Sequence, residues 1–101
     1  MEINGKEYEL KYNMKRVEMI ESNIGMPVMA LLQKNSGMLG IADLKTYFAL
    51  GLRETGSDVF VKPKEGMQIA EEMIERDGYV AVDSAVLEAL ERDCPFFFRA
   101  V

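Results

Sequence analysis

Few residues in this chain are of the types that perform catalysis, and they form no recognisable constellation. The 101 residues include no histidine and a single cysteine, Cys94. A serine or cysteine nucleophile normally needs a neighbouring base, most often histidine, and no serine here lies in a nucleophile motif. A lone cysteine without histidine is also a poor metal site. We therefore expect Cys94 to be a buried, unreactive thiol.

The carboxylates and glycines do not supply the missing chemistry. Glu71, Glu72, Glu75 and Asp77 have the spacing of a solvated helix face, whereas catalysis by paired carboxylates requires two acids in one pocket. The glycines near residue 40 lack the rest of either nucleotide-binding motif, and no Asp/Asn series matches a calcium loop. We expect a protein that is not an enzyme and has no cofactor or metal site.

Apolar residues that could contact a partner protein are the more suggestive candidates. Five of the eight methionines lie between residues 14 and 38. Methionine is flexible and suits surfaces that adapt to varied partners, although filling a core is its commoner role. Leu50 projects from the polar side of an expected helix, and three consecutive phenylalanines near the C-terminus must pack on the core or meet another chain. The candidate partner-binding residues are Met29, Leu50, Phe96, Phe97 and Phe98.

The charge is unevenly distributed along the chain. The net charge is −5, and all of it comes from residues 51–101, because residues 1–50 sum to zero. An acidic half disfavours nucleic-acid binding, which needs a basic patch, but it keeps a protein soluble or attracts a basic partner. No apolar run approaches the roughly 18 residues of a membrane span, and the N-terminus has no signal-peptide core. These features predict an intracellular protein that binds neither nucleic acid nor membrane.

The central element is predicted to be a helix over Ile41–Gly56. At 100° per residue, one face carries apolar residues, and Gly51 falls within that face. A glycine inside a helix costs about 1 kcal/mol relative to alanine, so its presence suggests that another element packs close to the backbone there. Gly56 is expected to end this helix in a left-handed conformation. The residues of the predicted core face are Ile41, Leu44, Tyr47, Phe48 and Leu52.

The remaining elements are read from turn, cap and periodicity signals. Asn4-Gly5 predicts a hairpin over residues 1–12, because both residues tolerate the positive φ of a type I′ turn. Asn13 is a candidate N-cap, and Asp83 or Ser84 could cap the last helix. Residues 79–82 are compatible with a short strand or with the start of that helix. The expected helices are Met14–Asn23, Pro27–Lys34, Lys64–Asp77 and a last one that Pro95 should end.

Together these signals predict one mainly α domain over residues 1–101. Its N-terminal β-hairpin, residues 1–12, is followed by about four to five short helices in residues 13–101. Because an isolated hairpin is only marginally stable in water, we expect it to lean on the helices.

The order of these features resembles the small tail assembly chaperones of long-tailed bacteriophages and gene transfer agents. The resemblance covers most of the chain but includes no catalytic signature. The region 78–83 departs from it, because the family runs straight into the last helix there. The residues that carry the resemblance are Ile3-Asn4-Gly5-Lys6-Glu7-Tyr8-Glu9-Leu10, the helix Met14–Ile24, Asp43-Leu44 through Ala49-Leu50-Gly51-Leu52, the acidic Ala70–Glu75, and Val86–Glu91 followed by aromatics.

The resemblance implies a non-enzymatic protein of the bacterial cytoplasm. Such chaperones bind the long, aggregation-prone tape-measure protein before tail-tube subunits polymerise around it, and a frameshifted longer form in some cases recruits the tube protein. Two alternatives remain open: a structural phage component retained in the particle, such as a head–tail connector, and a small subunit whose catalytic residues come from a partner. The aromatic tail also allows self-association into a homo-oligomer.

Overall fold

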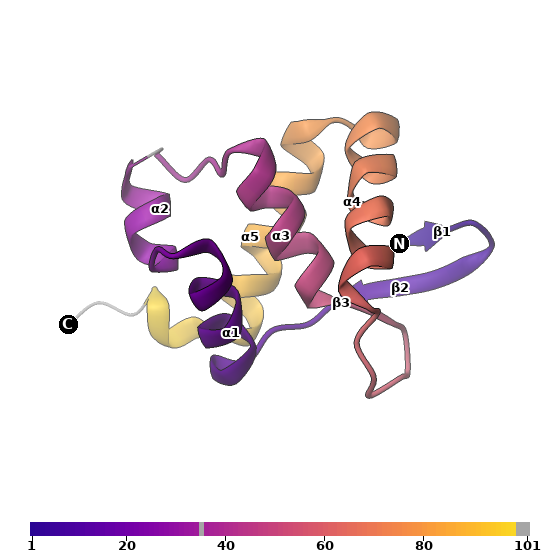
Figure 1. Ribbon diagram of the computed structural model, residues 1–101, viewed down its shortest axis with the longest axis horizontal. Coiled ribbons are helices and arrows are strands. Elements are labelled where there is room, and N and C mark those ends of the chain that lie inside the picture. Colours follow the sequence, from indigo (N-terminus) through magenta and orange to yellow (C-terminus); the bar gives the residue numbers. More distant parts are fainter. Residues whose placement is uncertain (35, 99–101) are drawn as a thin grey trace.

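The computed structural model describes residues 1–34 and 36–98. These residues form five α-helices, a short 3₁₀ helix and three β-strands, so the mainly α fold with an N-terminal hairpin is confirmed (Figure 1). The strands are β1 (Glu2–Ile3), β2 (Lys6–Leu10) and β3 (Leu52–Glu54). The helices are α1 (Met14–Ile24), α2 (Val28–Lys34), α3 (Ile41–Gly51), α4 (Pro63–Asp77), α5 (Tyr79–Asp93) and the 3₁₀ helix η1 (Pro95–Phe97).

The hairpin forms as its turn residues predict. Asn4 and Gly5 have φ values of 52° and 81°, the positive values that a type I′ turn requires. Beyond the turn, Tyr8 and Leu10 are buried, while Glu7 on the other face is exposed. The same alternation continues into the buried Tyr12, so this strand presents one apolar face to the helices.

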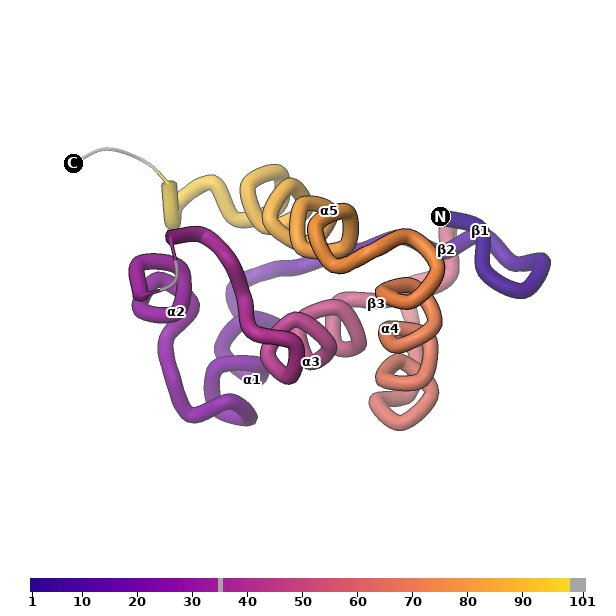
Figure 2. The backbone as a smooth tube through the Cα atoms, turned by 90° about the horizontal axis from the view of Figure 1, so that it is seen from above, coloured from indigo at the N-terminus to yellow at the C-terminus, as the bar shows by residue number. Residues whose placement is uncertain are grey.

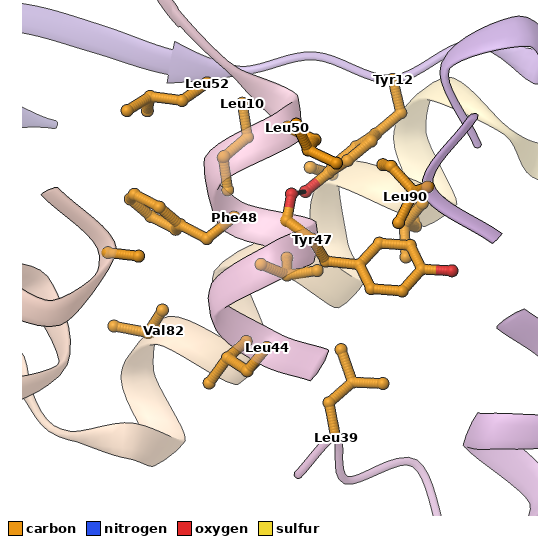
Figure 3. Close-up of a cluster of buried hydrophobic side chains, with 14 of the residues drawn as sticks. Leu10, Tyr12, Leu39, Leu44, Tyr47, Phe48, Leu50, Leu52, Val82 and Leu90 are labelled. Carbon is orange, nitrogen blue, oxygen red and sulfur yellow. Dashed lines mark hydrogen bonds between the residues drawn. The ribbon is translucent and has the colours of Figure 1, made fainter. Parts of the chain in front are cut away.

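α3 is the central helix, and it packs against α1, α4 and α5 (Figure 1). Leu44, Tyr47 and Phe48 are completely buried, which confirms most of the predicted core face. Ile41 is an exception: in the first turn of the helix it is 54% exposed. Figure 3 shows the core side chains from α3, β2 and α5 converging around this helix.

The predicted length of the central helix is wrong. α3 ends at Gly51, and Leu52–Glu54 form β3, which pairs antiparallel with β2 through Leu10–Leu52 and Tyr8–Glu54. The strand satisfies backbone groups along the second edge of β2, which would otherwise need partners. Gly56 has a positive φ of 86°, but it lies in the turn after β3 and does not cap a helix.

The prediction of close packing at Gly51 is confirmed. A Cβ atom at this position would lie 2.4 Å from Cζ of the Tyr12 ring. The Tyr12 hydroxyl donates a 2.6 Å hydrogen bond to the carbonyl of Tyr47, one turn earlier in α3. The aromatic ring therefore lies flat against the helix backbone where only glycine leaves room.

The predicted N-cap at Asn13 is confirmed, and two further helix boundaries have clear local causes. The side chain of Asn13 accepts a 2.8 Å hydrogen bond from the backbone N–H of Arg16, as an N-cap does. α1 then ends at Gly25, whose φ of 83° is the left-handed conformation of a C-cap. Pro63 occupies the first turn of α4, where its missing N–H costs nothing.

The start of the last helix differs from the predicted caps. α5 begins at Tyr79, directly after Gly78, so the ambiguous segment 79–82 is helical and neither Asp83 nor Ser84 caps it. Asp83 instead lies inside the helix, only 2% exposed, and accepts a 3.1 Å hydrogen bond from the backbone N–H of Leu39. The Tyr79 hydroxyl donates to the carbonyl of the same Leu39. The two side chains thus tie the segment before α3 to α5.

The elements are arranged along one long direction. The hairpin lies at one end, whereas α2 and η1 lie together at the other end in both views (Figures 1 and 2). α3 and α5 connect the two ends.

Candidate protein-binding site

An apolar groove runs between α1, α3, the segment 60–62 and the start of α4. Its volume is about 500 Å³, within the usual range of roughly 300–1,000 Å³ for ligand sites. Ala49 and Leu50 form its buried floor, and Met19 and Met67 contribute its flexible walls. The other lining residues are Arg16, Asn23, Thr46, Phe60, Val61, Lys62 and Pro63.

Arg16 and Phe60 stiffen one side of this groove. The guanidinium carbon of Arg16 lies 3.9 Å from the centroid of the Phe60 ring, a cation–π contact. Its Nε donates to the carbonyl of Leu50 at the last turn of α3, so the side chain spans from α1 to α3. Burial lowers the pKa of Arg16 below its ordinary value, but an arginine of this kind stays charged at neutral pH. Phe60 therefore covers an arginine side chain and is itself half-buried.

The predicted exposure of Leu50 is wrong. Its side chain is 5% exposed, because α1 covers the face of α3 that the helical pattern assigned to solvent. Leu50 nevertheless lines the groove from below. A partner that entered the groove would contact its methyl groups, but a charged substitution at Leu50 would mainly disturb folding.

The three phenylalanines divide between core and surface. Phe97 packs partly against the core, whereas Phe96 and Phe98 are each 42% exposed. The ring centroids of Phe96 and Phe97 are 4.8 Å apart, and those of Phe97 and Phe98 are 6.4 Å apart. These three residues form an aromatic patch on η1 and the residue after it. The rest of the C-terminal tail, residues 99–101, lies outside the described part of the chain.

Met29 belongs to α2, which lies at the same end of the molecule as η1, but its side chain is half-buried and packs against the core. Among the other methionines, Met14, Met19 and Met38 are more than a third exposed. The methionine cluster of the sequence is thus part core and part surface. The structure does not bring Met29, Leu50 and the phenylalanines into one site; Leu50 belongs to the groove, and the others lie at the end formed by α2 and η1.

Two kinds of site, a metal-binding cluster and a membrane-spanning helix, are absent from the described residues. Across residues 1–34 and 36–98, no group of three or more His, Cys, Asp or Glu side chains could hold a metal ion. Cys94 is fully buried, and burial is the main cause that raises the pKa of its thiol. Within the same ranges, no helix combines the length and apolar composition that crossing a membrane requires.

Sequence reasoning did not find most of the groove. Met19 belonged to the methionine cluster, but Arg16, Phe60 and Lys62 were not singled out. Arg16 is more than 40 residues away from Phe60 and Lys62 in the chain, and no sequence spacing relates it to them. Comparisons with protein-family models, with curated proteins and with solved structures found no significant match for this chain.

Proposed function

We propose that this protein is a non-enzymatic chaperone of bacteriophage tail assembly that binds an apolar segment of the tape-measure protein and keeps that protein soluble. The observation that carries the proposal is the apolar groove beside α3, whose walls include two flexible methionines, Met19 and Met67. A flexible apolar surface can accommodate varied sequences of a long client. The acidic second half of the chain helps to keep such a complex in solution.

The choice of client comes from the resemblance of this chain to tail assembly chaperones. The segments that carry the resemblance fall on the N-terminal hairpin, α1, α3 with the start of β3, α4 and α5. The one departure noted in the sequence, at residues 78–83, also disappears, because α5 follows α4 after the single residue Gly78. Tail-tube protein is a further candidate partner on the same grounds.

The proposal is tested by co-expression with the tape-measure protein of the same genome, followed by affinity purification. We expect the tape-measure protein to be soluble and to co-purify with the wild type. Met19→Asp places a carboxylate in the groove wall and should reduce the recovered tape-measure protein at least severalfold. Met14→Asp is the matched control, because Met14 is exposed on the same helix but does not line the groove.

Two results would count against the proposal. If the tape-measure protein stays insoluble and unbound with the wild type, the chaperone function is wrong. If mass spectrometry of purified phage particles finds this chain as a stoichiometric component, the protein is a structural component of the particle, such as a head–tail connector.

A further inference from the structure

The groove differs in charge from the rest of the protein. Arg16 and Lys62 are the two charged residues among those that line it, and both are cations. The chain as a whole carries a net charge of −5. A positively charged groove on an acidic protein selects for a segment with negative charge, because the rest of the surface repels that segment.

Arg16 is held in a fixed position at the groove. Its Nε donates to the carbonyl of Leu50, one Nη approaches Sδ of Met19 at 3.9 Å, and the guanidinium lies over Phe60. These contacts use two of the five N–H groups of an arginine. Within the described part of the chain, the other three have no protein acceptor and Arg16 forms no ion pair. The guanidinium of Arg16 is also partly buried and has therefore already lost some of its hydrating water. A carboxylate that enters the groove would meet a cation already held in position.

Lys62 supplies the second cation, from the segment that precedes α4. It precedes α4 as its N-cap residue, but its side chain makes no capping hydrogen bond. It is exposed, and within the described residues it has no ion-pair partner. Its charge is therefore available to a ligand. The floor of the same groove is apolar, formed by Ala49 and Leu50.

We infer that the groove binds an amphipathic segment of the client protein, with apolar side chains on its floor and at least one Asp or Glu directed at Arg16 and Lys62. This inference rests on the proposed chaperone function and specifies which part of the client is recognised. The methionine walls accept varied apolar side chains, whereas the cations require a carboxylate. The protein would thus select client segments by their charge pattern and tolerate changes in their apolar sequence.

The test uses fluorescently labelled, overlapping peptides of about 20 residues that cover the tape-measure protein, each long enough for several helical turns. Binding to the full chain is measured by fluorescence polarisation at low and high ionic strength. We expect the peptides that bind to contain Asp or Glu beside apolar residues, and their affinity to fall as salt is added. Lys62→Glu should weaken binding by about tenfold.

Lys64→Glu is the matched control, because Lys64 is exposed two residues away and does not line the groove. It makes the same change in net charge and should alter affinity by less than about twofold. Thermal unfolding followed by circular dichroism verifies that both variants fold.

The remaining outcomes separate this inference from the function on which it rests. If peptides without acidic residues bind equally well, or if both lysine variants have the same effect, the groove assignment is overturned while the chaperone function stands. The same holds if the full-length tape-measure protein co-purifies but no peptide binds. If neither the peptides nor the full-length protein bind, the proposed function and this inference fall together.

Discussion

Single residues in this protein have roles that depend on contacts within 3 Å. Gly51 is the clearest example, because a Cβ atom there would lie 2.4 Å from the Tyr12 ring, which is itself fixed by a hydrogen bond to the carbonyl of Tyr47. Figure 3 shows Tyr12 reaching the backbone of α3, with the hydroxyl of Tyr47 pointing away from it. The two tyrosines therefore use their hydroxyl groups differently.

Gly51→Ala should lower the free energy of unfolding by about 3 kcal/mol, because the new methyl group has no room beside Tyr12. Chemical denaturation followed by circular dichroism measures the change. Gly40→Ala is the control: a Cβ there meets no atom within 4 Å, so only the replacement of a favoured N-cap residue of α3 is felt, about 1 kcal/mol or less. Equal effects of both substitutions would contradict the packing described here.

Tyr47→Phe should leave stability unchanged or raise it by about 1 kcal/mol. The Tyr47 hydroxyl is buried and has no hydrogen-bond partner in the described part of the chain, so its removal relieves the cost of desolvation. Tyr12→Phe should instead destabilise by about 1 kcal/mol, because it removes the hydrogen bond to the Tyr47 carbonyl. Denaturant unfolding measures the free energy of unfolding of both variants. If Tyr47→Phe lowers it as much as Tyr12→Phe does, the two hydroxyl groups do not differ in the way described.

The elements are held together at a few junctions where a side chain of one satisfies the backbone of another. Asp93, in the last turn of α5, accepts a 2.9 Å hydrogen bond from the backbone N–H of Tyr12 and a 3.2 Å bond from Nζ of Lys11. Its side chain is only 2% exposed. The carboxylate therefore joins α5 to the segment between β2 and α1. Tyr12 lies beyond the end of β2, so its backbone N–H has no partner strand and needs another acceptor.

This junction predicts a pH dependence of stability. Burial by itself would raise the pKa of Asp93, but the hydrogen bonds from Arg92, Tyr12 and Lys11 outweigh it and lower the pKa to about 2. Because the folded-state pKa lies below the unfolded value of 3.8, the stabilisation is complete above about pH 4 and is lost as the pH falls toward 2. It amounts to about 2 kcal/mol.

Asp93→Asn removes this contribution, so at neutral pH the variant should be less stable by about 2 kcal/mol. The difference from the wild type should shrink as the pH falls from 4 to 2. Glu91→Gln is the control, because Glu91 is exposed in the same turn of α5. Urea unfolding at a series of pH values checks both. A difference for Asp93→Asn that is independent of pH would show that the charge of Asp93 does not stabilise the junction.

At the scale of the whole molecule, the exposed apolar surface is unevenly placed. Phe96 and Phe98 form an aromatic patch at one end with the half-buried Phe97, whereas Val59 and Val80 are exposed singly elsewhere. Single exposed apolar residues are ordinary, but a contiguous patch favours contact with another chain.

The double variant Phe96→Ser, Phe98→Ser should reduce self-association while it changes unfolding free energy by less than about 1 kcal/mol. We expect the sedimentation coefficient of the wild type to rise with protein concentration and that of the variant to stay constant. Val59→Ser, Val80→Ser removes two exposed apolar residues away from the patch and should behave like the wild type. A wild type that is monomeric at every concentration would exclude the patch as an interface between copies.

Local sequence signals predicted the features that depend on neighbouring residues along the chain. Asn4-Gly5 predicted the hairpin, Asn13 predicted the start of α1, and Gly51 indicated a close approach to the central helix. These signals are local because turns and caps need particular φ values or side-chain acceptors at single positions.

Only the tertiary structure decided where the central helix ends, whether Leu50 is exposed and which residues form the groove. Leu52 leaves the helix because β2 offers an edge with which it pairs, and Leu50 is buried because α1 lies over it. Arg16 and Lys62 line one groove although 45 residues separate them. Such contacts depend on how the elements pack against one another, and the pattern of a single segment does not encode the position of its neighbours.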